Sequence, residues 1–131
     1  NLNSMEDYVG VNNHMGSKFT KDGRGLAFVA HALSQRGLFF VDSRTSAGSV
    51  GAKVMRVMNV KAATRDVFLD HVVTKKAIWA ELARAEALAR QNGSVIAIAH
   101  PHKATLSVLE EWVTKPSTKK YHLVPVRELV K

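Results

Sequence analysis

The chain has 131 residues, of which 46% are apolar and 23% charged, a composition typical of one folded domain at most. Its 19 Lys and Arg exceed its 11 Asp and Glu by eight, but these cations are spread along the chain, so we expect no nucleic-acid partner. The absence of Cys excludes disulfides and thiolate catalysis, and no apolar run approaches the roughly 20 residues that a transmembrane helix needs.

The first half of the chain alternates between short apolar runs, typical of strands, and amphipathic stretches, typical of helices. Residues 8–11 predict a strand, and a helix follows from Asp22, with Gly37 placed to end it. Residues 38–41 form a continuous apolar run, which is typical of a strand covered on both faces. A second helix is predicted over residues 50–58.

The second half continues this alternation. Its predicted elements are, in chain order, a strand near residues 66–69, a helix over 74–92, a buried strand over 94–99, a helix from about Thr105 and a last strand over 121–126. Strands joined through helices pair in parallel. The predicted fold class is therefore α/β, with parallel strands that alternate with helices.

Polar residues follow each of the first four predicted strands. The carboxyl ends of parallel strands lie at one edge of a sheet, where functional groups gather. The residues at these ends are Asn12-Asn13-His14, Asp42-Ser43-Arg44, Asp70-His71 and His100-Pro101-His102. The recurrence of His and Asp at four strand ends favours metal binding or acid–base chemistry.

His14 and His100 are the leading candidates for this chemistry. The apolar strand before His100 holds it rigidly, so it can bind zinc or donate a proton, whereas His102 is more typical of a loop or cap residue. A lone His such as His14 is often structural, but its place at a strand end favours a metal or acid–base role. Asn13 beside it is either functional or a simple turn former.

Two acidic residues are the next candidates. Asp42 leaves a buried strand, so it is either a site carboxylate or the cap of the following helix. Arg44 lies two residues further on, and its pairing with Asp42 stays open. Strand alternation places Asp66 and Arg65 on opposite faces, and whichever of the two is buried would orient a substrate or ligand.

Four blocks of the sequence resemble the divergent polysaccharide deacetylase family. The blocks are Asn12-Asn13-His14-Met15-Gly16-Ser17, residues 38–45, residues 65–70, and Ile98-Ala99-His100-Pro101 with Thr105-Leu106. They occur in the family's order and span nearly the whole chain. The resemblance implies part of a distorted (β/α) barrel, and a periplasmic or secreted enzyme that removes acetyl groups from an envelope polysaccharide.

The resemblance also implies a divalent metal, commonly zinc, which polarises the acetyl carbonyl and activates water. A carboxylate then takes the proton of the water, and a His protonates the leaving group. Carried over to this sequence, the metal ligands are His14 and His100, and the catalytic residues are His100, Asp42 and Asp66. The substrate-binding residues are Arg44, Arg65 and Asn13.

The sequence departs from the related deacetylases at two points. Lys18 stands four residues after His14, where they carry a second His, and no pair of Asp residues precedes His14 as it does on their first strand. We therefore expect residues 1–131 to form a single deacetylase-like domain without its N-terminal strand and helix. The alternative is a catalytically inactive carbohydrate-binding or cell-envelope interaction domain with the same fold.

Overall fold

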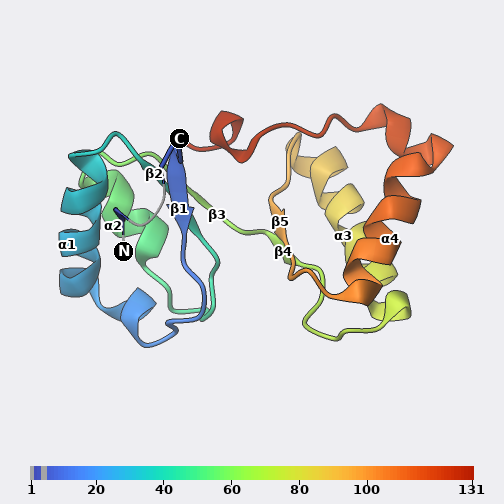
Figure 1. The fold of residues 1–131 in the computed structure, drawn as a ribbon, viewed down its shortest axis with the longest axis horizontal. Coiled ribbons are helices and arrows are strands. Elements are labelled where there is room, and N and C mark those ends of the chain that lie inside the picture. Colours follow the sequence, from blue (N-terminus) through green and yellow to red (C-terminus); the bar gives the residue numbers. More distant parts are fainter. Residues whose placement is uncertain (1, 4–5) are drawn as a thin grey trace. The chain divides into compact units, whose positions relative to one another are not determined.

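The structure is a computed structural model that describes residues 2–3 and 6–131. Its strands are β1 (Gly10–Asn12), β2 (Phe39–Asp42), β3 (Ala62–Thr64), β4 (Val67–Phe68) and β5 (Ala97–Ile98). Its α-helices are α1 (Gly23–Ser34), α2 (Gly51–Val57), α3 (Lys75–Asn92) and α4 (Lys103–Thr114) (Figure 1). Three short 3₁₀ helices are η1 (Phe19–Lys21), η2 (Pro116–Lys120) and η3 (Val126–Glu128).

The chain divides into two compact units, each with its own parallel sheet. Unit 1 comprises the residues up to Thr64 together with Val126–Lys131, and its sheet has the order β1-β2-β3. Unit 2 is Arg65–Pro125, and its sheet pairs β4 with β5. All three strand pairings are parallel, so the predicted α/β class with alternating strands and helices is confirmed.

The core of unit 1 lies between its sheet and the helices α1 and α2. Asp22 caps α1 by accepting a hydrogen bond from the Arg24 N–H at 3.0 Å. Gly37, with a φ of +64°, lets the chain turn back into β2 after this helix. The buried side chains of this core are Leu26, Ala30, Leu33, Leu38, Phe40, Ala52, Met55, Val60 and Ala62.

The core of unit 2 is built on α3, the longest helix of the described residues. Thr74 caps its start by accepting a hydrogen bond from the Ala77 N–H, and Gly93 ends it with a φ of +81°, which matches the helix predicted over residues 74–92. The apolar stripe of α3 packs against β4 and α4. The buried side chains are Val67, Leu69, Ile78, Leu82, Ala85 and Val108.

Three strand predictions need correction. The strand predicted near residues 66–69 is β4, and a further strand that was not predicted, β3, lies just before it in a different sheet. The division falls at Asp66, whose carboxylate accepts the Ile96 N–H at 2.8 Å and so fixes the start of the second sheet. Asp66 therefore precedes β4 and does not lie within a strand.

The other two corrections concern the strands predicted after α3. The strand over residues 94–99 is reduced to Ala97–Ile98, and Ala97 is exposed, because the structure pairs β5 with β4 alone. Residues 121–126 form no strand. Pro125 lacks an N–H for a ladder, and the Tyr121 hydroxyl instead contacts Arg90 and Glu86 on α3.

No α-helix of the described residues combines the length and the apolar character that crossing a membrane requires.

Candidate functional site

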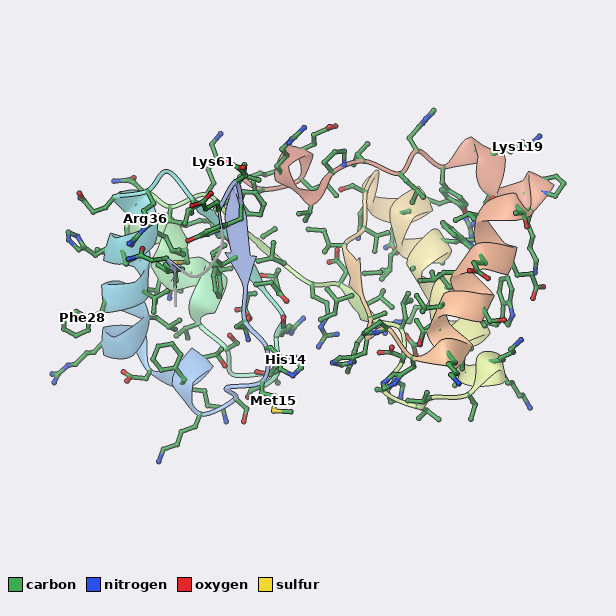
Figure 2. The ribbon with its side chains drawn as sticks, viewed as in Figure 1. His14, Met15, Phe28, Arg36, Lys61 and Lys119 are labelled. Carbon is green, nitrogen blue, oxygen red and sulfur yellow. The ribbon has the colours of Figure 1, made fainter. Side chains whose placement is uncertain are left out.

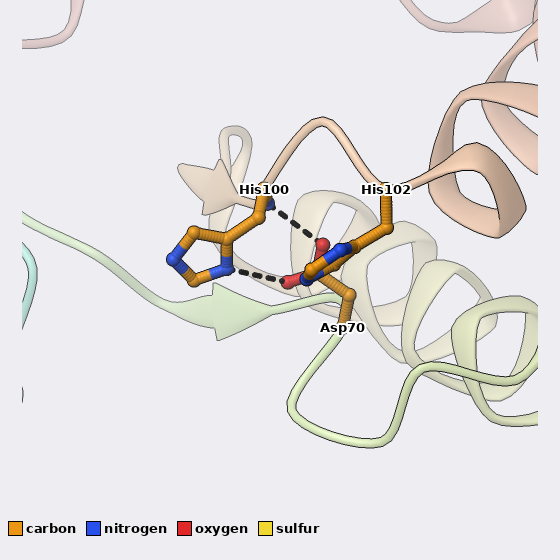
Figure 3. Close-up of side chains that lie close together, drawn as sticks. All are labelled: Asp70, His100 and His102. Atoms are coloured by element: carbon orange, nitrogen blue, oxygen red, sulfur yellow. Dashed lines mark hydrogen bonds and ion pairs between the residues drawn. The ribbon is translucent and has the colours of Figure 1, made fainter.

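The most organised polar group in unit 2 surrounds Asp70, two residues after β4. Its side chain is fully buried. Oδ2 accepts the backbone N–H of His100 at 2.7 Å and the Thr105 hydroxyl at 2.9 Å. Oδ1 lies 3.2 Å from His100 Nδ1 (Figure 3). One carboxylate thus ties the end of β4 to the turn after β5 and to the first turn of α4.

The charge of Asp70 reflects competing effects. Burial alone would raise the pKa of Asp70, because a charged carboxylate loses water there. Hydrogen bonds from the His100 backbone, the Thr105 hydroxyl and the His100 imidazole favour the ionised form and hold the pKa of Asp70 below its usual value of 3.8. Asp70 is therefore an ionised carboxylate at neutral pH.

The two histidines come from the turn between β5 and α4. The carbonyl of His100 accepts the His102 N–H at 2.8 Å, and His102 occupies the cap position of α4. The two imidazole rings lie 5.6 Å apart between centroids, and both are close to Asp70 (Figure 3). The Phe68 ring meets His100 edge-on at 5.4 Å. His100 is therefore held by a carboxylate and by an aromatic ring of β4.

Asp70, His100 and His102 could hold a divalent metal ion. Each offers one ligand atom, and these atoms lie within 4.8 Å of one another. Two imidazoles and a carboxylate are donors typical of zinc and related metals. Two ligands about 2.0 Å from a tetrahedral zinc ion lie roughly 3.3 Å apart. The 3.2 Å between Asp70 Oδ1 and His100 Nδ1 would match this separation if a bound metal ion replaced the hydrogen bond between these two atoms.

Arg65 and Asp66 lie at the other end of the unit 2 sheet from this group. Asp66 bonds to Ile96, just before β5, whereas Asp70 and His100 follow the two strands. The guanidinium of Arg65 lies 5.3 Å from the centroid of the Phe68 ring, the same ring that meets His100. The structure thus links Arg65 to His100 through an aromatic side chain and gives Asp66 a contact with β5.

In unit 1, hydrogen bonds join the end of β1 and the residues after it to the end of β2 and the residues after it. Asn12 donates to the Val41 carbonyl and to the Ser43 hydroxyl, at 2.9 and 2.6 Å. Asn13 Oδ1 accepts the Ser43 N–H at 2.8 Å, and its amide group donates to the Met15 carbonyl at 3.2 Å. The Asn13 side chain therefore holds loop backbone, which is the turn-forming role that the sequence left open.

Asp42 is 2% exposed, and both of its carboxylate oxygens accept hydrogen bonds. Oδ1 accepts the Arg44 N–H at 2.7 Å. Oδ2 accepts the Ser49 hydroxyl at 2.7 Å and the Ala52 N–H at 3.3 Å. Because Ala52 lies in the first turn of α2, these contacts match the helix-capping alternative for Asp42.

His14 is exposed on the loop after β1, next to Met15 (Figure 2). Met15 has a φ of +57°, and Arg44 on the neighbouring loop has a φ of +48°. Residues other than glycine rarely adopt this left-handed backbone conformation. The Thr45 hydroxyl donates to the Met15 carbonyl at 3.3 Å, which joins the two loops once more. Two unusual backbone conformations therefore lie at adjacent strand ends.

The comparison of the sequence with protein families decides the relationship of this chain. The profile of the divergent polysaccharide deacetylase family matches residues 1–130. The chain belongs to this family. The uncharacterized protein YibQ of Escherichia coli strain K12 is 41% identical over 130 residues, which are 99% of this chain and 39% of YibQ. An uncharacterized protein of Haemophilus influenzae strain Rd is 38% identical over 108 residues, 82% of this chain and 39% of that protein.

A solved structure shares the fold of this member of the divergent polysaccharide deacetylase family. The crystal structure of the uncharacterized protein ATU2773 from Agrobacterium tumefaciens C58 matches with a TM-score of 0.89 at 29% identity. The match covers 94% of this chain and 50% of that chain. The chain thus spans half of the solved structure and well under half of the two curated relatives.

Of the group around Asp70, the sequence prediction names His100 but misses its partners Asp70 and His102. The sequence places Asp70 at a strand end without making it a site residue, and it favours a loop or cap role for His102. His102 occupies the N-cap position of α4 without a capping hydrogen bond from its side chain, and it also belongs to the group that could hold a metal. The sequence does carry a signal for Asp70, because it comes at the end of an apolar run just as Asp42 does. His31, His71 and His122 are exposed elsewhere.

Proposed function

We propose that this protein hydrolyses acetyl groups on a polysaccharide of the cell envelope with the help of a divalent metal, zinc in the first instance. The observation that carries this proposal is the group of Asp70, His100 and His102 in a member of the divergent polysaccharide deacetylase family. The donor atoms suit such a metal, and the buried carboxylate is held in its ionised form.

A metal bound there would polarise the acetyl carbonyl and lower the pKa of a water molecule. His100 is the residue best placed for proton transfer. Asp70 holds the His100 ring through Nδ1. The other ring nitrogen, Nε2, would then exchange a proton with the leaving group. Phe68 fixes the same ring from the side. His100 therefore serves as a ligand or as the general acid, the two roles that the sequence left open.

The remaining predicted site residues are part of the same proposal. We propose His14 as a metal ligand, Asn13, Arg44 and Arg65 as substrate-binding residues, and Asp42 and Asp66 as the sequence-based candidates for a proton acceptor. The 131 residues would belong to a single deacetylase-like domain. Family membership supports a periplasmic or secreted location.

Acetate release tests this proposal. The protein is stripped of metal with a chelator, reloaded with Zn²⁺ and incubated with oligomers of N-acetylglucosamine. We expect acetate release that requires the metal. The His100→Gln variant should lose about 10²- to 10⁴-fold in kcat, the usual contribution of a general acid. The matched control is His31→Gln, which changes an exposed histidine on α1 and should keep full activity.

Two results would contradict the proposal in different ways. Acetate release that continues at full rate without metal would remove the metal from the reaction. Binding of the oligomers without any acetate release, with or without metal, would favour the alternative of an inactive carbohydrate-binding domain. Metal analysis of the purified protein separates this second outcome from a failure to load the site.

A further inference from the structure

Thr105 has an unusual environment for a hydroxyl group. It lies in the first turn of α4 and is 0% exposed. Its hydroxyl donates to Asp70 Oδ2 at 2.9 Å, across from the helix to the end of β4. A hydrogen bond to an ionised carboxylate is stronger than one between neutral groups. The contact therefore couples the position of α4 to the orientation of one buried carboxylate.

The two oxygens of Asp70 have different surroundings. Oδ2 accepts two hydrogen bonds, one from the His100 backbone and one from Thr105. An ionised carboxylate has about two acceptor sites on each oxygen, so these donors occupy Oδ2. Oδ1 faces the His100 imidazole. Oδ1 is therefore the oxygen that can bind a cation together with the histidines.

We propose that Thr105 is a positioning residue that fixes the Asp70 carboxylate, so that Oδ1 is presented to a divalent cation shared with His100 and His102. The inference rests on the metal site of the proposed function. Without the Thr105 hydroxyl, Oδ2 would keep a single donor, and the carboxylate could rotate away from the orientation that a metal requires. Residues that orient a metal ligand in this way commonly contribute about 10- to 100-fold to metal affinity.

A second buried threonine of unit 2 provides a matched comparison. Thr118 is 6% exposed, and its hydroxyl donates to the Lys115 carbonyl at 2.6 Å, within one turn of η2. Removing either hydroxyl takes one hydrogen bond from unit 2. Of these two threonines, only Thr105 bonds to a residue of the candidate metal group, Asp70. Metal affinity thus separates a positioning role from a general contribution to stability.

The test is a calorimetric titration of the metal-free protein with Zn²⁺ alone. Thr105→Val keeps the volume of the side chain and removes the hydroxyl, and we expect it to weaken Zn²⁺ binding by about 10- to 100-fold. Thr105→Ser restores the hydroxyl and should restore most of the affinity. Thr118→Val should bind Zn²⁺ as the unaltered protein does. Should Thr105→Val fail to fold, Thr105→Ala removes the same hydroxyl with a smaller side chain.

Three results would overturn the inference. They are Zn²⁺ affinity unchanged in Thr105→Val, no recovery in Thr105→Ser, and an equal loss of affinity in Thr118→Val. The Asp70→Asn variant distinguishes these from a failure of the proposed function. If Asp70→Asn lowers Zn²⁺ affinity but Thr105→Val does not, the metal site stands and the role of Thr105 is wrong. If the unaltered protein does not bind Zn²⁺, both proposals fail.

Discussion

The Asp70 carboxylate illustrates what is needed to keep a charge inside a small unit. Its side chain has no exposure to water, and burial of an uncompensated charge would strongly destabilise the fold. The compensation comes from three donors on two residues, His100 and Thr105. All three lie after Asp70 in the chain, so the carboxylate is stabilised only once β4, β5 and α4 have assembled.

The lowered pKa of Asp70 makes stability depend on pH in a defined direction. Since its pKa in the folded protein lies below 3.8, ionised Asp70 stabilises the fold above that pH, and this contribution is lost as the pH falls through the lower value. Asp70→Asn should therefore reduce the free energy of unfolding at pH 7 by about 1–3 kcal/mol. The deficit should shrink below pH 3.8, as measured by urea unfolding at pH 7 and pH 3.

Asp22→Asn is the control for this prediction. Asp22 is also a carboxylate that accepts a backbone N–H, but it is exposed at the start of α1, and Asn caps helices as well as Asp does. We expect little change in stability at either pH. A deficit in Asp70→Asn that stays constant between pH 7 and pH 3 would mean that its charge does not stabilise the fold.

The site residues differ in how far local sequence determines them. His100 could be predicted because an apolar run leads directly into it. Whether Asp66 or Asp70 is the carboxylate of the site depends on where β4 begins and ends. The pairing of β4 with β5, some 30 residues away, sets these bounds. Similarly, Asp42 as a helix cap was foreseen as one of two alternatives, but the capped N–H of Ala52 lies ten residues on.

At the scale of elements, the helices were predicted better than the strands. Thr74 and Gly93 bound α3 because caps and apolar stripes are local signals. Strand length depends on a partner that local sequence does not reveal. The apolar run before His100 is predicted as a buried strand over residues 94–99. In the structure only Ala97 and Ile98 of this run are paired, and both pair with β4. The single strand predicted near residues 66–69 likewise missed β3.

The start of α2 gives a test of close packing between elements. Gly51 is the first residue of α2, and a Cβ added there would lie 2.7 Å from Asp42 Oδ2 and 3.1 Å from a ring carbon of Phe40. Gly51→Ala should therefore displace the helix or the Asp42 cap. We expect a loss of about 1–3 kcal/mol in the free energy of unfolding, the usual effect of overpacking. Chemical denaturation measures it.

Gly23→Ala is the matched substitution at the start of α1. There the nearest atom to an added Cβ is a methyl carbon of Val54 at 4.0 Å, an ordinary contact. We expect no loss, or a gain of about 0.4–1 kcal/mol from the reduced freedom of the unfolded chain. An equal change in the free energy of unfolding for Gly51→Ala and Gly23→Ala would show that α2 and Asp42 have room for the added methyl group.

At the scale of the whole molecule, the two units carry separate hydrophobic cores. Leu33 and Ile78 are both 0% exposed, one in each core. Leu33→Ala should lower the protection of amides in unit 1, and Ile78→Ala that of amides in unit 2, by about 2–5 kcal/mol in the free energy of opening. Native-state hydrogen exchange of each variant measures this. Equal loss across the whole chain in both variants would indicate one cooperative unit.

Met15 and Arg44 have a consequence for any effort to stabilise this protein. Glycine would adopt their left-handed backbone at little cost, whereas other residues lose of the order of 1 kcal/mol there. A screen for thermostability would therefore favour glycine at both positions. Both loops carry residues proposed to bind metal or substrate, so such a screen would also alter the loops on which the proposed activity depends.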